Sequence, residues 1–185
     1  MRIGILAVQG AFAEHEIMLN KLGVETILLR KKEDINNIDG LILPGGESTV
    51  QGKLIKELDM YDSLKSLISN GIPVLATCAG LILLSSQLSN DNNVYLGTLP
   101  VTVKRNAYGR QLGSFNAIGK VGELSDFKMS FIRAPIIEDV SDGVEILAKV
   151  DEQIVGVKYK NQIGLSFHPE IGIDTRIHEL FLKQL

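Results

Sequence analysis

Apolar residues in the first half of the chain follow two alternating patterns. Short continuous runs of Ile, Val and Leu are typical of strands that are buried on both faces. Between these runs, apolar residues recur every three or four positions, which predicts helices. The patterns predict strands over residues 2–8, 24–29, 40–43 and 72–76, and helices over residues 12–22, 48–58, 61–70 and 81–88. Strands that alternate with helices favour a mostly parallel sheet between two helical layers.

The second half of the chain is richer in predicted strands. Gly, Asp and Asn separate its apolar runs, and Asp151-Glu152 has the length of a tight hairpin turn. We expect strands over residues 99–104, 113–119, 130–133, 144–150, 153–158 and 162–167, and a closing helix over 175–185. No linker or repeat divides the sequence, so residues 1–185 are expected to form a single three-layer α/β/α domain. Its central sheet would be mixed, with the later strands added to it as antiparallel members.

Composition and charge exclude several classes of function. The chain has 19 basic and 22 acidic residues and a net charge of −3, which leaves no positive surplus for nucleic-acid phosphates. Residues 66–90 are uncharged, but Asn70, Gly71 and Pro73 interrupt their apolar run, so no membrane span is expected. The single cysteine, Cys78, excludes an intrachain disulfide and favours a cytoplasmic location. We therefore expect neither a nucleic-acid nor a membrane partner.

Cys78 stands where a predicted strand runs into a predicted helix. The small residues Ala79 and Gly80 follow it and allow a sharp turn. The start of a helix favours a thiolate, and the backbone N–H of Ala79 is available there for a developing oxyanion. These features are typical of a catalytic nucleophile. From position alone, a buried structural cysteine fits equally well.

A cysteine nucleophile requires a base, and the base requires a group that orients it. His168 ends a predicted strand and is followed by Pro169 and Glu170. Residues two apart in an extended chain point to the same side, so Glu170 is expected beside the His168 imidazole. A histidine in a polar loop is the alternative. His15 lies between two glutamates in the first helix and is expected on its solvent-facing side.

Three further polar segments contain residue types that are used in binding sites. Glu14-His15 and His178-Glu179 match no known spacing of metal ligands, so no metal site is expected. Residues 44–48 (Pro-Gly-Gly-Glu-Ser) join a strand to a helix, but Gly46 stands where a phosphate loop requires lysine. We expect the Gly46 backbone N–H to approach a ligand closely and Ser48 to cap the helix that follows. A plain strand-to-helix turn is the alternative.

Three motifs of this chain resemble those of the class I, or triad, glutamine amidotransferases. They are Pro44-Gly45-Gly46-Glu47-Ser48, Thr77-Cys78-Ala79-Gly80-Leu81 and Phe167-His168-Pro169-Glu170. Residues 4–11, 103–111 and 131–135 are similar, more narrowly, to the glutaminase subunits of two-part pyridoxal 5′-phosphate synthases. This second similarity extends over essentially the whole chain. It implies the flavodoxin-like fold of class I glutamine amidotransferases and hydrolysis of L-glutamine to L-glutamate and ammonia, without a cofactor.

The resemblance also implies a role for each matching residue. Cys78 would be the nucleophile, His168 the base and then the acid, and Glu170 the partner that orients His168. The backbone N–H groups of Gly46 and Ala79 would bind the oxyanion. The residues implied to bind glutamine are Gly46, Glu47, Ser48, Arg105, Ile132 and Arg133. Either arginine has the charge to bind the α-carboxylate, and Glu47 has the charge to attract the α-ammonium.

The resemblance further implies a partner that uses the ammonia. In the family this is the synthase, a (β/α)₈ barrel, and glutaminases lie on the outside of a large hetero-oligomer. Family members are poor glutaminases until the synthase docks, with the backbone at residues 44–46 as the expected switch. Two alternatives are a glutaminase subunit for imidazole glycerol phosphate synthase and a non-enzymatic cysteine stress protein of similar fold. Stress proteins of this kind lack a His-Pro-Glu sequence after the last strand, so His168 and Glu170 count against the second alternative.

Overall fold

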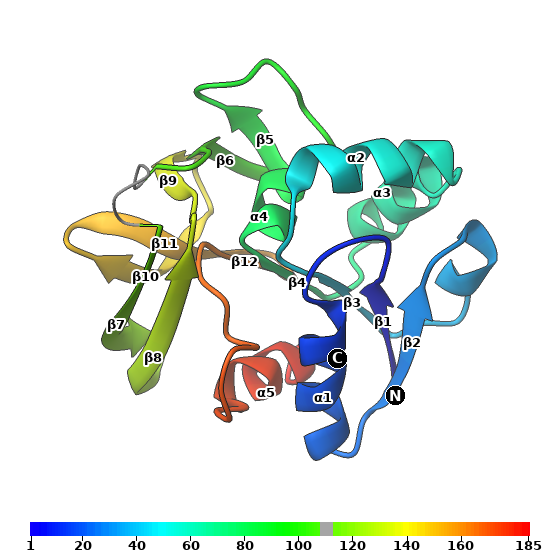
Figure 1. Cartoon of the computed structure of the whole chain (residues 1–185), viewed down its shortest axis with the longest axis horizontal. Helices are drawn as coiled ribbons and strands as arrows, with labels where there is room; N and C mark the ends of the chain where they lie inside the picture. The colour runs from blue at the N-terminus through cyan, green and yellow to red at the C-terminus, as the bar shows by residue number, and fades with distance from the viewer. Residues whose placement is uncertain (108–112) are drawn as a thin grey trace.

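The central element of the fold is a mixed, ten-stranded sheet (Figure 1). The computed structural model of the chain describes residues 1–107 and 113–185. Five strands at one end of the sheet are parallel, in the order β2-β1-β3-β4-β12. Their bounds are β1 Arg2–Leu6, β2 Glu25–Leu29, β3 Gly40–Leu43, β4 Val74–Thr77 and β12 Gln162–Leu165.

Helices cover both faces of this parallel region. One face packs against three helices, α2 (Ser48–Glu57), α3 (Tyr61–Ser69) and α4 (Ala79–Leu84). The other face packs against α1 (Phe12–Lys21) and α5 (Arg176–Leu182). Within β3, Leu41 and Leu43 face the first layer and Ile42 faces the second, so every position of the strand is buried. This double burial explains the continuous apolar runs in the sequence, and it confirms the predicted three-layer α/β/α fold.

The later strands extend the sheet mostly as predicted. β12 continues into the antiparallel series β11-β9-β6, with β5 at the edge and β10 paired to β11. The bounds are β5 Ser85–Leu88, β6 Leu99–Lys104, β9 Ile136–Val140, β10 Glu145–Val150 and β11 Gln153–Tyr159. Val150 pairs with Gln153, and Asp151 and Glu152 both have positive φ, which confirms the predicted tight hairpin.

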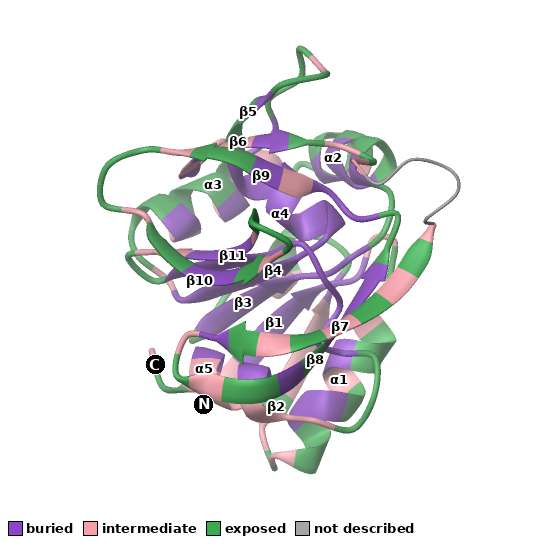
Figure 2. Ribbon diagram, turned by 90° about the vertical axis from the view of Figure 1, so that its left-hand side faces the viewer, coloured by how far each residue is buried: buried purple, intermediate pink, exposed green. Residues whose placement is uncertain are grey.

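Two predictions about these strands were wrong. The helix expected over residues 81–88 ends at Leu84, because the next four residues pair with β6 as an edge strand. Strands β7 (Ser114–Val121) and β8 (Leu124–Ile132) form a separate two-stranded sheet instead of joining the large one. One face of this hairpin packs on the main sheet through aromatic residues, and its other face is exposed (Figure 2). β9 had no counterpart among the predicted elements.

The parallel arrangement determines where functional groups collect. The carboxyl ends of β1, β3, β4 and β12 meet at one edge of the sheet. Gln9, Gly45, Cys78 and His168 follow these four strands within a few residues. Ligands of open α/β sheets bind outside this edge. No helix of the described residues is long and apolar enough to cross a membrane.

The α5 helix is expected to be essential to the core. The Phe181 side chain is completely buried against the sheet, beside Gly40 and Ile3. We predict that Phe181→Ala lowers the free energy of unfolding by about 3–5 kcal/mol, because it removes buried apolar contacts and leaves a cavity. Ile118→Ala, on an exposed position of β7, is the control and should change stability by no more than about 0.5 kcal/mol. Denaturant unfolding measures both, and equal effects would contradict this packing.

Candidate active site

Cys78 occupies a strained turn between β4 and α4. Its backbone has φ of +48° and ψ of −101°, a conformation that residues with a Cβ atom rarely adopt. Gly80 makes the turn possible, since a Cβ there would lie 2.0 Å from the Leu43 carbonyl oxygen of β3. The Cys78 side chain is mostly buried but lines a cavity, and its sulfur lies 3.9 Å from the Ile132 carbonyl oxygen. The turn therefore presents one thiol to that cavity.

His168 lies between Cys78 and Glu170. Its Nδ1 is 2.7 Å from Glu170 Oε1, and the neighbouring Cys78 thiol acts on the ring by raising its pKa. Gly45 packs directly against the ring, where a Cβ would lie 2.3 Å from His168 Cε1. The histidine is thus held from three sides, by a carboxylate, a thiol and a backbone. The two side chains meet as expected, but the extended chain predicted at these residues was wrong: β12 ends at Leu165, and the Ile171 N–H donates to the His168 carbonyl in a turn.

The surroundings of His168 favour its charged form. Burial by itself lowers the pKa of His168, but hydrogen bonds to Cys78 and Glu170 outweigh it and raise this pKa to about 10. The pKa of Glu170 is lowered: burial raises it, but the electrostatic interaction with His15 and the hydrogen bond and charge of His168 act in the opposite direction and prevail. At neutral pH the arrangement is therefore a buried pair of imidazolium and carboxylate beside the sulfur.

A cavity of about 410 Å³ opens in front of the sulfur. Most of the residues that the sequence had indicated line this cavity, namely Gly46, Glu47, Ser48, Cys78, Arg105, Ile132, Arg133 and His168. Glu170 lies behind His168, and Ala79 follows Cys78 in the chain. The structure thus brings the predicted residues to one place, although Tyr108–Gln111 of the motif at 103–111 lies outside the described residues.

Two backbone N–H groups near the sulfur have no acceptor. Among the residues that the structure describes, neither Gly46 nor Ala79 donates a hydrogen bond from its backbone. The Gly45 carbonyl, by contrast, accepts from the Ala11 N–H at 2.9 Å. The Gln9 side chain, which sequence analysis missed, accepts from the Glu47 N–H at 2.8 Å. The loop after β1 therefore holds the backbone of residues 45–47 in place. Gln9 could have been recognised from the sequence because it follows a parallel strand, where ligand-binding residues collect.

The two arginines differ in their partners. Arg105 pairs with Asp91 at 2.6 Å and with Glu47 at 3.3 Å. Arg133 has positive φ and lines the cavity, and within the described parts of the chain it forms no ion pair. The predicted cap was wrong: Glu47, and not Ser48, is the N-cap of α2, because its carboxylate accepts from the N–H groups of Thr49 and Val50.

His15 does not lie on a solvated face, and this prediction was also wrong. Its side chain is completely buried, as is that of His178 on α5. His15 Nδ1 lies 2.9 Å from His178 Nε2, and His15 Nε2 lies 3.4 Å from Glu170 Oε2. The prediction failed because the glutamates on either side of His15 occupy neighbouring faces of the helix, while His15 itself points inward.

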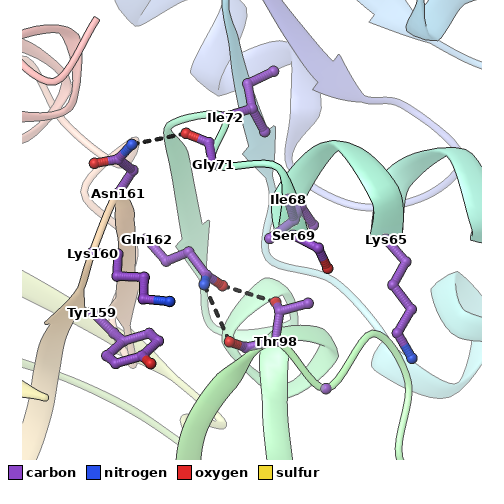
Figure 3. A pocket seen from close by; sticks show the side chains of 11 residues that line it. Lys65, Ile68, Ser69, Gly71, Ile72, Thr98, Tyr159, Lys160, Asn161 and Gln162 are labelled. Carbon is purple, nitrogen blue, oxygen red and sulfur yellow. Dashed lines mark hydrogen bonds between the residues drawn. The ribbon is translucent and has the colours of Figure 1, made fainter. Parts of the chain in front are cut away.

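A second cavity, of about 320 Å³, lies at the opposite edge of the sheet (Figure 3). Gly71 and Asn161 line it just before β4 and β12 begin, and Asn161 donates to the Gly71 carbonyl at 2.8 Å. Gln162 is likewise bound to both oxygens of Thr98. No cysteine, histidine or carboxylate lines this cavity in the described structure. Of these two cavities, the one at Cys78 has a thiol and an imidazole in its described lining.

Comparison with known proteins agrees with this geometry. Residues 5–185 match the model of the SNO glutamine amidotransferase family. The chain belongs to this family. A crystal structure described as a glutamine amidotransferase is 40% identical, has a TM-score of 0.94 and overlaps 98% of this chain and 97% of its own.

Curated relatives are similar along their full length. A protein of Desulfitobacterium hafniense (strain Y51) is 62% identical over 100% of this chain and 94% of its own. One of Methanocorpusculum labreanum is 52% identical over 100% of this chain and 98% of its own. Both are named pyridoxal 5′-phosphate synthase subunit PdxT. The chain is therefore a glutamine amidotransferase, as the resemblance implied.

The charge state of His168 is open to direct measurement. Its pKa of about 10 predicts that the ring does not titrate between about pH 5 and 8 in ring-nitrogen NMR spectra. Because the folded pKa exceeds the unfolded value of 6.5, the stabilisation is complete below pH 6.5 and is lost as the pH rises towards 10. The stability difference between the wild type and His168→Gln should decrease over that range. A midpoint near 6.5 for His168 in the native chain would contradict the ion pair.

Proposed function

We propose that the chain is the glutaminase subunit of a pyridoxal 5′-phosphate synthase. It hydrolyses L-glutamine to L-glutamate and ammonia, and passes the ammonia to the synthase subunit for vitamin B6 biosynthesis. The observation that carries the proposal is that Cys78 and His168 line one cavity and that Glu170 holds His168 from behind. The names of the full-length relatives support the choice of this synthase over other ammonia users.

Cys78 is the proposed nucleophile. Its sulfur attacks as a thiolate, with the thiol proton held on the His168 ring, and forms a bond to the side-chain carboxamide carbon of glutamine while the carbonyl oxygen becomes an oxyanion. The unpaired N–H groups of Gly46 and Ala79 are the proposed donors to that oxygen. One such donor contributes about 3–4 kcal/mol of transition-state stabilisation in other acyl-transfer enzymes.

His168 then moves the protons of the reaction. As an imidazolium it protonates the leaving nitrogen, so ammonia departs and a γ-glutamyl thioester remains on Cys78. The neutral ring next takes a proton from water, which attacks the thioester carbon and releases glutamate. Glu170 holds Nδ1 throughout and stabilises the imidazolium each time it forms. Glutamine and water give glutamate and ammonia, with no other reactant.

Arg133 is the proposed partner of the glutamine α-carboxylate. Arg105 is already paired with two carboxylates, whereas Arg133 lines the cavity without an ion pair in the described residues. A guanidinium binds a carboxylate through two parallel hydrogen bonds. Gly46, Glu47, Ser48 and Ile132 also line the cavity and complete the proposed glutamine site. Within it, the half-exposed carboxylate of Glu47 attracts the α-ammonium.

The synthase subunit, a (β/α)₈ barrel in a large hetero-oligomer, is the proposed partner. Ammonia in water becomes ammonium, which is not nucleophilic, so a direct path to an acceptor enzyme is chemically useful. The Gly45 carbonyl is bound by the Ala11 N–H, so a partner that moves the β1–α1 loop would also move the oxyanion donor at Gly46. A catalytic thiol of this kind fits the reducing cytoplasm as the location.

Cys78→Ala and addition of the synthase test the proposal. We predict that the wild-type chain releases glutamate slowly alone and faster with a pyridoxal 5′-phosphate synthase barrel subunit, because docking completes the oxyanion site. Cys78→Ala should reduce this release to background, since no acyl acceptor remains, while still assembling with the barrel. Coupled glutamate assays and size-exclusion chromatography measure both.

The barrel subunit of an imidazole glycerol phosphate synthase is the control partner, and it should not stimulate the chain. Turnover that persists in Cys78→Ala would refute the nucleophile. Full activity without any partner would refute the switch, and stimulation by the control barrel alone would refute the choice of synthase.

Arg133→Ala and Arg133→Lys test substrate binding. The alanine variant should raise KM for glutamine about tenfold to a hundredfold, because a hydrogen bond to a charged group contributes about 1.5–3 kcal/mol. It should change kcat much less, since the α-carboxylate is remote from the reacting amide. Arg133→Lys retains the charge but not the two parallel hydrogen bonds, so its KM should lie between those of the wild type and Arg133→Ala. An unchanged KM in Arg133→Ala would assign the carboxylate to another residue.

A further inference from the structure

Two buried histidines extend the line of polar groups beyond Glu170. His15 comes from α1 and His178 from α5, and both side chains are fully buried. Glu170 uses Oε1 for His168, and its other oxygen, Oε2, lies 3.4 Å from His15 Nε2. Within the described residues, Oε2 has no hydrogen bond of good geometry. Among the ion-pair contacts of the described residues, the His15 ring is the group that lies beside this buried charged oxygen.

The contacts of the two rings select one pair of tautomers. If His15 carries its proton on Nε2, that N–H meets Thr77 Oγ1 at 3.3 Å with Glu170 Oε2 beside it at 3.4 Å, and Nδ1 accepts from the Nε2–H of His178. His178 Nδ1 then has no proton, which fits its lack of any partner in the described part of the chain. The opposite choice places a bare nitrogen against a carboxylate and leaves a buried N–H unpaired, at a cost of about 1–3 kcal/mol.

Both rings are neutral in this arrangement. Burial lowers the pKa of His15, with His168 in the same direction and Glu170 and Glu14 opposed to it. Burial and the neighbouring His15 lower the pKa of His178 to about 3. A neutral His15 donates one hydrogen bond to Glu170 without neutralising its charge. No group of three or more His, Cys, Asp or Glu among the described residues has an arrangement that could hold a metal ion.

We propose that His15 is a positioning residue for the amidotransferase reaction, with its ring held by His178 so that its Nε2–H fixes the second oxygen of Glu170. Glu170 would otherwise be free to rotate its carboxylate away from His168, because Oε2 has no alternative partner. The inference rests on the proposed roles of Cys78, His168 and Glu170. It adds that α1 and α5, distant in sequence, determine the orientation of the base.

Variants of His15 with matched polarity separate positioning from packing. His15→Gln places an amide nitrogen near the former Nε2 and retains a donor to Glu170. His15→Asn places its amide near the former Nδ1 and reaches only His178. His15→Leu removes both contacts. With the synthase barrel present, we expect His15→Asn and His15→Leu to lower kcat at least about tenfold with little change in KM, since a misplaced base slows the chemical step. His15→Gln should remain within about threefold of the wild type.

The pH profile provides a readout that packing alone would not change. Without its second donor Glu170 protonates more readily, so the acidic limb of kcat should move to higher pH in His15→Asn but not in His15→Gln. Leu19→Ala, which shortens a buried side chain of the same helix, is the control for stability. It should lower the unfolding temperature and leave the pH profile unchanged. Equal kcat and pH profiles for the glutamine and asparagine variants would overturn the proposal.

NMR of ring nitrogens tests the same arrangement without an activity assay. In the wild-type chain, His15 and His178 should both be Nε2–H tautomers at neutral pH. An Nδ1–H tautomer for His15 would overturn the inference even if the chain is an active glutaminase. An inactive wild-type chain in which the expected tautomers are found would instead count against the proposed function alone.

Discussion

The hydrogen bond between His168 and Glu170 is the interaction on which the site depends. It is 2.7 Å long, and both side chains are buried or nearly so. A buried carboxylate is costly unless it is paired, and a buried histidine next to it is thereby held charged and in one orientation. The direction of the ring in turn decides whether the Cys78 sulfur has a proton-transfer partner. Cys78, Gly45 and His168 therefore form one unit, although three different strands carry them.

The parallel core and the three proposed catalytic residues could be predicted because each depends on residues that are close together in the sequence. The apolar run of β3 is continuous because both of its faces are buried, so its pattern predicted the parallel core directly. The motif of residues 168–170 predicted that His168 and Glu170 meet, and they do, although they meet across a turn because β12 ends at Leu165. The cysteine is followed by Gly80, whose absence of a Cβ is required by the close approach to Leu43. In each case the information lies within a few consecutive residues.

The failures have a common physical origin in long-range contacts. The glutamates beside His15 predicted an exposed side chain, yet His15 contacts His178, which lies 163 residues further along the chain. Ser85–Leu88 has a local preference for helix, yet pairing with β6 makes it a strand. Arg105 and Arg133 were equivalent in the sequence, and only the positions of Glu47 and Asp91 distinguish them. Periodicity and short motifs contain no information about such partners.

The central claim is that Cys78 accepts the γ-glutamyl group of glutamine. Rapid acid quenching of the wild-type chain, mixed with glutamine and the synthase barrel, followed by mass spectrometry of its peptides, tests this claim most directly. If Cys78 is the nucleophile, the mass of the peptide that contains it should rise transiently by one γ-glutamyl group and return to its original value as glutamate accumulates. Release of glutamate with that peptide unmodified at every time point, or with the acyl group on another residue, would contradict this role of Cys78.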